Sequence, residues 1–463
     1  MPSKHAVDSS TLPGIIFFAV MKKVIFFLIF PLLFIPSCSK KIDARQTKKE
    51  ISARKSYGVW TDYFNTVERL KKSAVSEFVN SLSLEERVSQ VFIENLTGDT
   101  VFQPVEEVRA ITENPDDTTP LVPGGYLFFS YNLASSPEKI MDFTDSIRDF
   151  CVERGITPPF LAIDQEGGFV NRLRAVSGPL PSQKRVADNL DVKNAYRLYA
   201  LQAIQMHSLG FHLNMAPVAE ALSPENESFL SDRSFGDRDT ASLYSALCVN
   251  AYQNYGVGAV LKHFPGNSNT DPHTGLPEIR LSKEMLDEQL LPFKKCVGKN
   301  PAGVLMSHAR TSCLDETVPA CFSSKWITDE LRQNYGFDGI VFSDDIFMGA
   351  LNKNGYPPEK AVVMAIEAGV NCIMISEKRF GAVAKVLVKK AREDAAFSKM
   401  ISQSAEKIIE FKIHAKILTL LQKDDGSGYV VAMNGSQQTL HDRLFYFTEA
   451  RAENIDLYLE RFY

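Results

Sequence analysis

The 463-residue sequence predicts an α/β fold, specifically a (β/α)8 barrel of the TIM type. Three observations support this prediction. From about residue 85, short apolar segments alternate with segments of helical periodicity, there are eight of the apolar segments, and ionisable residues directly follow five of them. Eight alternating units favour a closed barrel over an open doubly wound sheet, and no GxGxxG motif follows the first strand candidate to suggest dinucleotide binding.

The strand candidates share a short apolar run, rich in β-branched and aromatic residues. In chain order they are Gln90–Glu94, Gly125–Phe129, Phe160–Ile163, Phe211–Ala216, Gly258–Lys262, Gly303–Ser307, Gly339–Phe342 and Asn371–Ile375. Helical periodicity is evident at Val192–Leu209 and Pro358–Ala368, and a helix at about Lys399–Leu421 closes the unit. We therefore place the barrel at residues 80–421 and a C-terminal tail at 422–463, which begins in a Gly/Ser turn and ends in an amphipathic stretch.

The N-terminal region has the composition of an export signal. A basic stretch at Met21–Lys23 precedes the apolar run Val24–Ile35, and Pro36–Cys38 leads into a Lys-rich segment. The apolar run is shorter than the roughly 20 residues that a membrane-spanning helix needs. The residues around Cys38 resemble a bacterial lipoprotein signal, in which this cysteine is acylated. We expect an exported protein, periplasmic or on the cell surface and lipid-anchored to a membrane, with an uncleaved anchor as the alternative.

The formal net charge of -5 averages two regions of opposite sign. Residues 1–72 carry a net +8, and residues 73–463 carry a net -13. An acidic body repels polyphosphate, so nucleic acid is not an expected partner. We read residues 1–38 as an upstream extension plus a lipoprotein-type signal peptide, and residues 39–79 as a polar tether with a lead-in helix.

The seven cysteines are scattered and include no CxxC pair. Neither a zinc site nor a dense disulfide framework is indicated, and we expect no metal. Cys313 and Cys321 are close enough in sequence to form a bridge, but the sequence does not decide whether they do.

Polar and ionisable residues collect at one end of the predicted strands, where a (β/α)8 barrel builds its active site. Asp164 and Glu166 follow the third strand, and Arg233 lies in the long loop after the fourth. The other residues of this kind are Lys262, His263, Asp271, His273, His308, Asp344 and Asp345. A purely structural role would scatter such residues over both ends of the barrel, so we read them as one site.

Three motifs at these positions resemble glycoside hydrolase family 3. They are Lys262–Gly266 (KHFPG), Asp164–Gly168 (DQEGG) and Phe342–Asp345 (FSDD). The resemblance spans about residues 80–420 and is greatest to the β-N-acetylglucosaminidase branch, whose members are single-barrel enzymes that keep their acid on a barrel loop. It implies a retaining mechanism with a covalent glycosyl-enzyme intermediate and no cofactor.

The resemblance also implies the roles of three residues in the reaction. Asp344 matches the nucleophile, although the ordinary job of a strand-end Asp is to cap the following helix. His273 matches the general acid/base with Asp271 as its partner, and a carboxylate suits an imidazole by fixing its tautomer and stabilising its charge. The loop between Gly266 and His273 is about two residues shorter than the family pattern, which puts the reach of this pair in doubt.

The remaining residues are expected to bind sugar or to support those that do. By resemblance, Asp164, Arg233, Lys262 and His263 contact substrate hydroxyls or the N-acetyl region, and Lys262 is also expected to keep Asp344 ionised. Glu166 is expected to orient the loop around Asp164, with a role as an alternative acid left open. His308 is either a donor behind the sugar-binding residues or a barrel histidine with a structural role, and Asp345 is expected to hydrogen-bond the backbone or to tune Asp344.

The leading prediction is therefore a retaining exo-glycosidase that removes terminal β-linked N-acetylglucosamine, for example from peptidoglycan fragments. Two alternatives keep the same scaffold: an N-acetylglucosaminide phosphorylase, because a neutral His acid/base does not repel phosphate, and a β-glucosidase. A third alternative is an inactive glycan-binding surface lipoprotein.

Overall fold

The computed structural model describes residues 68–272, 275–433 and 438–463, and the cysteine of the predicted lipid site, Cys38, lies outside this range. The eight predicted strands are present and form one parallel sheet: β1 (Phe92–Asn95), β4 (Gly125–Phe128), β5 (Phe160–Ile163), β8 (Leu213–Asn214), β9 (Gly258–Phe264), β11 (Gly303–Met306), β13 (Ile340–Ser343) and β14 (Ile373–Ile375). A parallel bridge between Phe342 and Cys372 joins the two outer strands and closes the sheet. The prediction of a (β/α)8 barrel is confirmed.

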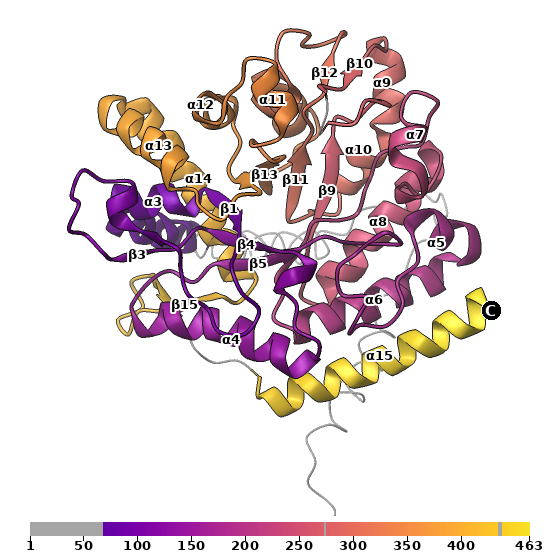
Figure 1. The fold of residues 1–463 in the computed structure, drawn as a ribbon, viewed down its shortest axis with the longest axis horizontal. Helices are drawn as coiled ribbons and strands as arrows, with labels where there is room; N and C mark the ends of the chain where they lie inside the picture. The colour runs from indigo at the N-terminus through magenta and orange to yellow at the C-terminus, as the bar shows by residue number, and fades with distance from the viewer. Residues whose placement is uncertain (1–67, 273–274, 434–437) are drawn as a thin grey trace, which may run out of the picture. The chain divides into compact units, whose positions relative to one another are not determined.

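Helices surround the strands (Figure 1). From the second strand on, each strand is followed by a helical segment, namely α4 (Pro137–Glu153), α6 (Val192–Ser208), α8 (Arg238–Asn254), α10 (Leu291–Val297), the π-helical segment Lys325–Asn334, α12 (Pro358–Ala368) and α13 (Gly381–Glu393). Helix α3 (Leu84–Gln90) precedes β1, and a 3-10 turn (Val108–Ala110) beside a short hairpin, β2 (Glu106–Glu107) with β3 (Pro120–Leu121), takes the place of the first outer helix. The predicted helix at Pro358–Ala368 ends as its sequence suggests, at Gly369 with φ 108°.

Two hydrophobic layers hold the barrel together. Alternate strand residues such as Ile93, Leu127 and Val260 fill the interior, while the outward residues pack against the helices. Helix α14 (Ala395–His414) closes the amino end of the barrel, where Phe411 packs edge-on against Phe160 with ring centroids 5.6 Å apart. With the amino end closed in this way, ligands have access from the carboxyl ends of the strands.

The chain after the barrel is ordered into a hairpin and a long helix. The predicted helix over 399–421 ends instead at His414, because Lys416 turns the chain with φ 60° and the next residues form β15 (Leu418–Gln422), paired with β16 (Tyr429–Met433). Helix α15 (Leu440–Phe462) lies along α4 and α6 (Figure 1). Its buried apolar residues belong to the same core as the barrel helices.

Shorter strands and helices lie within the loops at the carboxyl ends of the barrel strands. They are β6 (Gln165–Gly167) paired with β7 (Val170–Asn171), β10 (Glu278–Ile279) paired with β12 (Arg310–Thr311), and the helices α5 (Gln183–Asn189), α7 (Glu227–Leu230), α9 (Lys283–Gln289) and α11 (Gly349–Lys353). Both cysteines of the possible bridge, Cys313 and Cys321, are free thiols. Among the described helices, none is long and apolar enough to cross a membrane.

Candidate active site

The predicted site residues of the described chain gather at the carboxyl ends of the strands, as the sequence suggested. Asp164 directly follows β5, Lys262 and His263 lie near the carboxyl end of β9, and Asp344 directly follows β13. His308 lies two residues beyond β11. Because parallel strands end on one side of a barrel, the side chains from these elements converge.

Lys262 is the centre of a buried ion network. Its Nζ lies 2.7 Å from Oδ1 of Asp164 and 2.6 Å from Oε1 of Glu166. Burial lowers the pKa of the ammonium, but these two carboxylates outweigh burial and raise the pKa above its ordinary value. Lys262 therefore stays positively charged inside the barrel.

Glu166 joins this network to the next loop. Arg233 donates to both of its oxygens, from Nε and Nη2, each at 2.9 Å, in the bidentate geometry that a guanidinium and a carboxylate favour. Burial opposes ionisation of Glu166, but Lys262 and Arg233 outweigh it and lower the pKa of this carboxyl to about 2. Glu166 thus binds two cations, Lys262 of β9 and Arg233 of the loop after β8.

His263 is held by a carboxylate that the sequence analysis missed. Nδ1 of His263 donates to Oε1 of Glu220 at 2.7 Å, and the backbone N–H of Asn267 donates to Oε2 of the same carboxylate at 2.7 Å. The Asn267 side-chain amide adds a bond of 3.1 Å to Oε1. These contacts fix the imidazole with Nδ1 protonated, so Nε2 is the nitrogen left for a ligand.

A signal for Glu220 was present in the sequence. It is the one charged residue in the apolar run that follows the fourth strand, Ala216–Ala221, and the loop it occupies is bonded to β9 through Ala219 N–H and Lys262 C=O at 2.8 Å. A glutamate that is 3% exposed in such a run needs partners inside the protein.

Asp344 has an environment that favours its ionised form. Its carboxylate accepts a hydrogen bond of 2.8 Å from the backbone N–H of Asp345. Burial raises the pKa of Asp344, but the imidazoles of His308 and His263, this N–H and the Lys262 ammonium together lower it below its ordinary value. A carboxylate that is ionised and half-buried at the mouth of the barrel can act as a nucleophile.

His308 and Asp345 lie behind Asp344. Nε2 of His308 is 3.0 Å from the carbonyl oxygen of Asp345, and Nδ1 is 3.3 Å from Sγ of Cys321. The Asp345 side chain accepts from the backbone N–H groups of Phe347 and Ser376, each at 3.0 Å, so it organises the turn after β13. Burial raises the pKa of Asp345, whereas the pKa of Asp344 is lowered.

The predicted acid/base pair is described only in part. His273 lies outside the described residues. Asp271 is exposed in the loop after β9, and its carbonyl oxygen accepts from the Gly275 N–H at 3.1 Å. The same loop is bound to the loop after β8, where the Asn269 side chain accepts from the Ser228 N–H at 2.9 Å. In the described part of the chain, no group of three or more His, Cys, Asp or Glu side chains could hold a metal ion.

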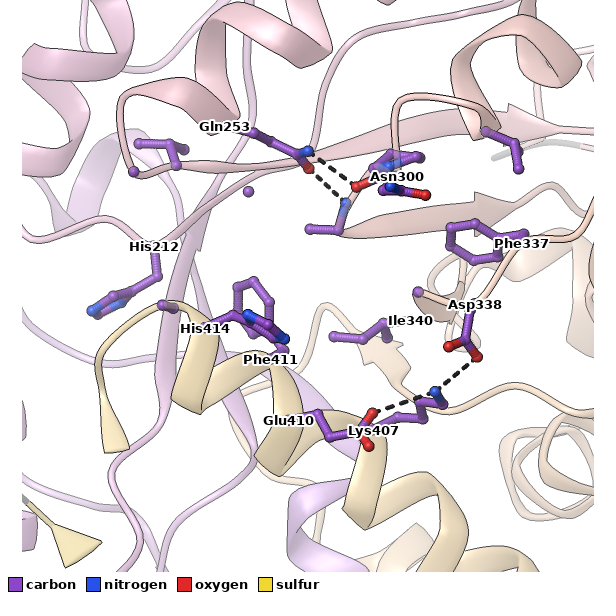
Figure 2. A pocket seen from close by; sticks show the side chains of 18 of the residues that line it. His212, Gln253, Asn300, Phe337, Asp338, Ile340, Lys407, Glu410, Phe411 and His414 are labelled. Carbon is purple, nitrogen blue, oxygen red and sulfur yellow. Dashed lines mark hydrogen bonds and ion pairs between the residues drawn. The ribbon is translucent and has the colours of Figure 1, made fainter. Parts of the chain in front are cut away.

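A separate hollow of about 480 Å³ lies at the opposite end of the barrel (Figure 2). It is lined by the amino ends of strands, including Gly258 and Ile340, and by α14. Its charged side chains satisfy one another, because Nζ of Lys407 is 2.8 Å from Asp338 and 3.3 Å from Glu410. None of the predicted site residues lines this hollow, so it is not the candidate active site.

Comparison with known proteins agrees with the fold. Beta-hexosaminidase LpqI of Mycobacterium tuberculosis is 28% identical over 290 residues, which cover 60% of this chain and 74% of that protein. A beta-hexosaminidase of Pseudomonas aeruginosa is 30% identical over 266 residues, covering 56% of this chain and 76% of that protein. The structure of a glycoside hydrolase family 3 beta-N-acetylglucosaminidase from Paenibacillus superposes with a TM-score of 0.64 at 24% identity, covering 80% of this chain and 68% of that one, and supports the fold.

The family model of the glycosyl hydrolase family 3 N terminal domain matches residues 94–411. This range runs from the first barrel strand to the helix that closes the barrel, and it contains every candidate site residue discussed above. The chain is therefore a glycoside hydrolase that belongs to family 3.

Proposed function

We propose that this protein is a retaining exo-glycosidase that hydrolyses terminal β-linked N-acetylglucosamine. The observation that carries the proposal is the Asp344 carboxylate at the end of β13, with a lowered pKa and with His263, His308 and Lys262 around it. The names of the curated relatives, which are beta-hexosaminidases, support the choice of an N-acetylhexosamine.

In the proposed reaction, Asp344 attacks the anomeric carbon while His273, assisted by Asp271, protonates the leaving oxygen. A glycosyl-aspartate ester forms and the aglycone alcohol departs. In the second half, His273 takes a proton from water, the hydroxide attacks the same carbon, and the bond to Asp344 breaks. Two inversions return the β-configuration in the product.

Exposure separates the residues proposed to contact sugar from those proposed to support them. The side chains of Asp164 and Arg233 are 20% and 24% exposed, whereas those of Lys262 and Glu166 are 5% and 2% exposed. Lys262 has three N–H donors and gives two of them to carboxylates, so one remains for a sugar hydroxyl. Asp164 and Arg233 are thus the main polar contacts in this proposal, with Lys262 at the floor of the site.

A substrate panel tests the activity. Aryl β-N-acetylglucosaminide and aryl β-glucoside are compared, each with and without inorganic phosphate, and the products and their initial anomeric form are identified by NMR. The proposal predicts turnover of the acetamido glycoside to free β-N-acetylglucosamine. A sugar phosphate as product, preference for the glucoside, or no turnover of either substrate would each replace it with one of the alternative functions.

Trapping of the intermediate tests the role of Asp344. An N-acetylglucosaminyl fluoride with a second fluorine on the ring forms the ester readily but loses it slowly. Peptide mass spectrometry is expected to find the sugar on Asp344. A label on Glu166 or Asp345 instead would show that the nucleophile was assigned wrongly.

We also propose that the chain is exported and held at a membrane by a lipid on Cys38. The supporting observation is the order of basic, apolar and small residues before this cysteine. Labelling of cells with radioactive palmitate should mark the wild type and leave a Cys38→Ser variant unlabelled. Equal labelling of both would contradict the anchor.

A further inference from the structure

Helix α15 lies outside the range that the family model matches, yet it reaches toward the candidate active site through buried amides. The side chain of Asn454, on the inner face of α15, is fully buried. Its Oδ1 accepts a hydrogen bond of 2.9 Å from Nε2 of Gln202 on α6. Two helices can pack through apolar side chains alone, so a fully buried hydrogen bond between amides at this position is not needed for packing.

The next residues link α6 to the loop that follows β7. Gln202 Nε2 also donates to the carbonyl oxygen of Gly178 at 3.1 Å, and the Gly178 N–H donates to Oε1 of Gln205 at 2.7 Å. A Cβ at position 178 would overlap the side-chain oxygen of Asn454, so only glycine lets the loop approach α15 this closely. Loop, α6 and α15 therefore meet at one polar point.

The last residue of this chain of hydrogen-bonded amides, Gln165, is the sequence neighbour of two residues of the ion network. Gln165 stands in the chain between Asp164 and Glu166, and its Nε2 is 3.5 Å from Oε1 of Gln202 and 2.9 Å from Oδ1 of Asn171. Its Oε1 accepts from the Leu173 N–H at 3.2 Å. The side chain of Gln165 thus joins the two strands of the β6–β7 hairpin and also links this hairpin to α6.

We propose that Asn454 is a positioning residue for substrate binding: through Gln202 and Gly178 it holds the β6–β7 hairpin so that Asp164 and Glu166 face Lys262. This inference rests on the proposed function, in which Asp164 contacts the sugar. Asp344, which follows β13, is not part of the amide chain. The perturbation should therefore appear in KM, with little effect on kcat.

The experiment compares three variants of the full chain. Asn454→Leu keeps the shape of the side chain and removes the acceptor. Asn454→Asp keeps an acceptor oxygen in place; because the site is fully buried and Nδ2 of Asn454 has no hydrogen-bond partner, the new carboxyl is expected to be protonated and neutral, with its O–H in the place of Nδ2. Arg443→Met loosens the other end of the same helix, where Arg443 binds Asp145 at 2.7 Å and the Ser208 carbonyl oxygen at 2.8 Å.

Two readouts are measured: steady-state kinetics with the aryl glycoside, and hydrogen exchange of peptides that span residues 165–178. Asn454→Leu should raise KM about fivefold with kcat within about twofold, and should speed exchange at these residues. Asn454→Asp should restore most of the wild-type KM. Arg443→Met should lower the melting temperature without either effect.

The two readouts keep the inference separate from the proposed function. If the wild type turns over none of the substrates, the proposed function fails, while the exchange comparison still decides whether Asn454 holds the hairpin. If Asn454→Leu and Arg443→Met give the same exchange at residues 165–178, or if KM is unchanged in Asn454→Leu, the positioning role is refuted.

Discussion

Replacement of Lys412 by methionine should make the protein more stable at neutral and acidic pH. Lys412 lies on the inner face of α14 and is fully buried, and its Nζ donates to Oε1 of Gln90 at 2.6 Å. Burial lowers the pKa of the ammonium from 10.5 to about 7, and the nearby thiols of Cys151 and Cys372 only partly oppose it. Between about pH 7 and pH 10.5, Lys412 is therefore mostly neutral in the folded protein and mostly charged in the unfolded chain.

The magnitude follows from linkage between protonation and folding. A folded-state pKa below the unfolded value means that the cost of Lys412 is absent above pH 10.5, grows as the pH falls and is complete below pH 7. A fall from 10.5 to about 7 corresponds to about 5 kcal/mol at 1.36 kcal/mol per pH unit. Between pH 10 and pH 6 the wild type should lose about 4 kcal/mol of stability relative to Lys412→Met.

Urea denaturation at pH 6, 7, 8, 9 and 10 measures this difference. Lys399→Met, an exposed lysine on the same helix, is the control and should follow the wild type at every pH, because its side chain is in water in both states. Methionine loses the bond to Gln90, which shifts the whole curve by about 1–3 kcal/mol but does not change its slope. A difference between wild type and Lys412→Met that is constant across this range would refute the reasoning.

Three further predictions concern the site and the thiols. Glu220→Gln should lower kcat/KM at least tenfold, measured with the aryl glycoside, because His263 loses the charge that fixes its tautomer, and should also lower the melting temperature, because an amide nitrogen cannot accept from the N–H groups that the carboxylate binds. Glu166→Gln should destabilise the protein by about 3 kcal/mol in urea denaturation at neutral pH, since Lys262 loses a buried partner; this contribution is complete above pH 4.5 and is lost as the pH falls toward 2. Among the six described cysteines, Cys313 should be alkylated first in the native protein, because the other five are buried, and equal rates by mass spectrometry would contradict this.

The barrel could be predicted because its signals are local. Each strand is an apolar run of four to seven residues or a short part of one, and the alternation with helices leaves few topologies to consider. The boundaries were less certain: only Leu213–Asn214 of the predicted strand Phe211–Ala216 forms ladder pairs. Pairing of a strand depends on its neighbours in space, and the sequence of one strand does not contain that information.

The site residues could be placed at one end of the barrel, but their partners could not be assigned. Lys262 was expected beside Asp344, and the structure gives its two short contacts to Asp164 and Glu166. Glu220 was missed because a single glutamate in an apolar run has no motif of its own. Which carboxylate a buried cation meets is decided by the path of loops from different strands, and this is a property of the tertiary structure.

Several groups together stabilise the negative charge of the proposed nucleophile, Asp344. His308 and His263 lower the pKa of Asp344 more than Lys262 does, and the two short contacts of Lys262 are to other carboxylates, Asp164 and Glu166. Those carboxylates in turn keep Lys262 ionised and orient it, and Glu166 does the same for Arg233. The ion network around Lys262 and the groups around Asp344 therefore consist largely of different residues. Substrate binding and nucleophile activation can then be altered by separate substitutions, which is what the KM and kcat comparisons above require.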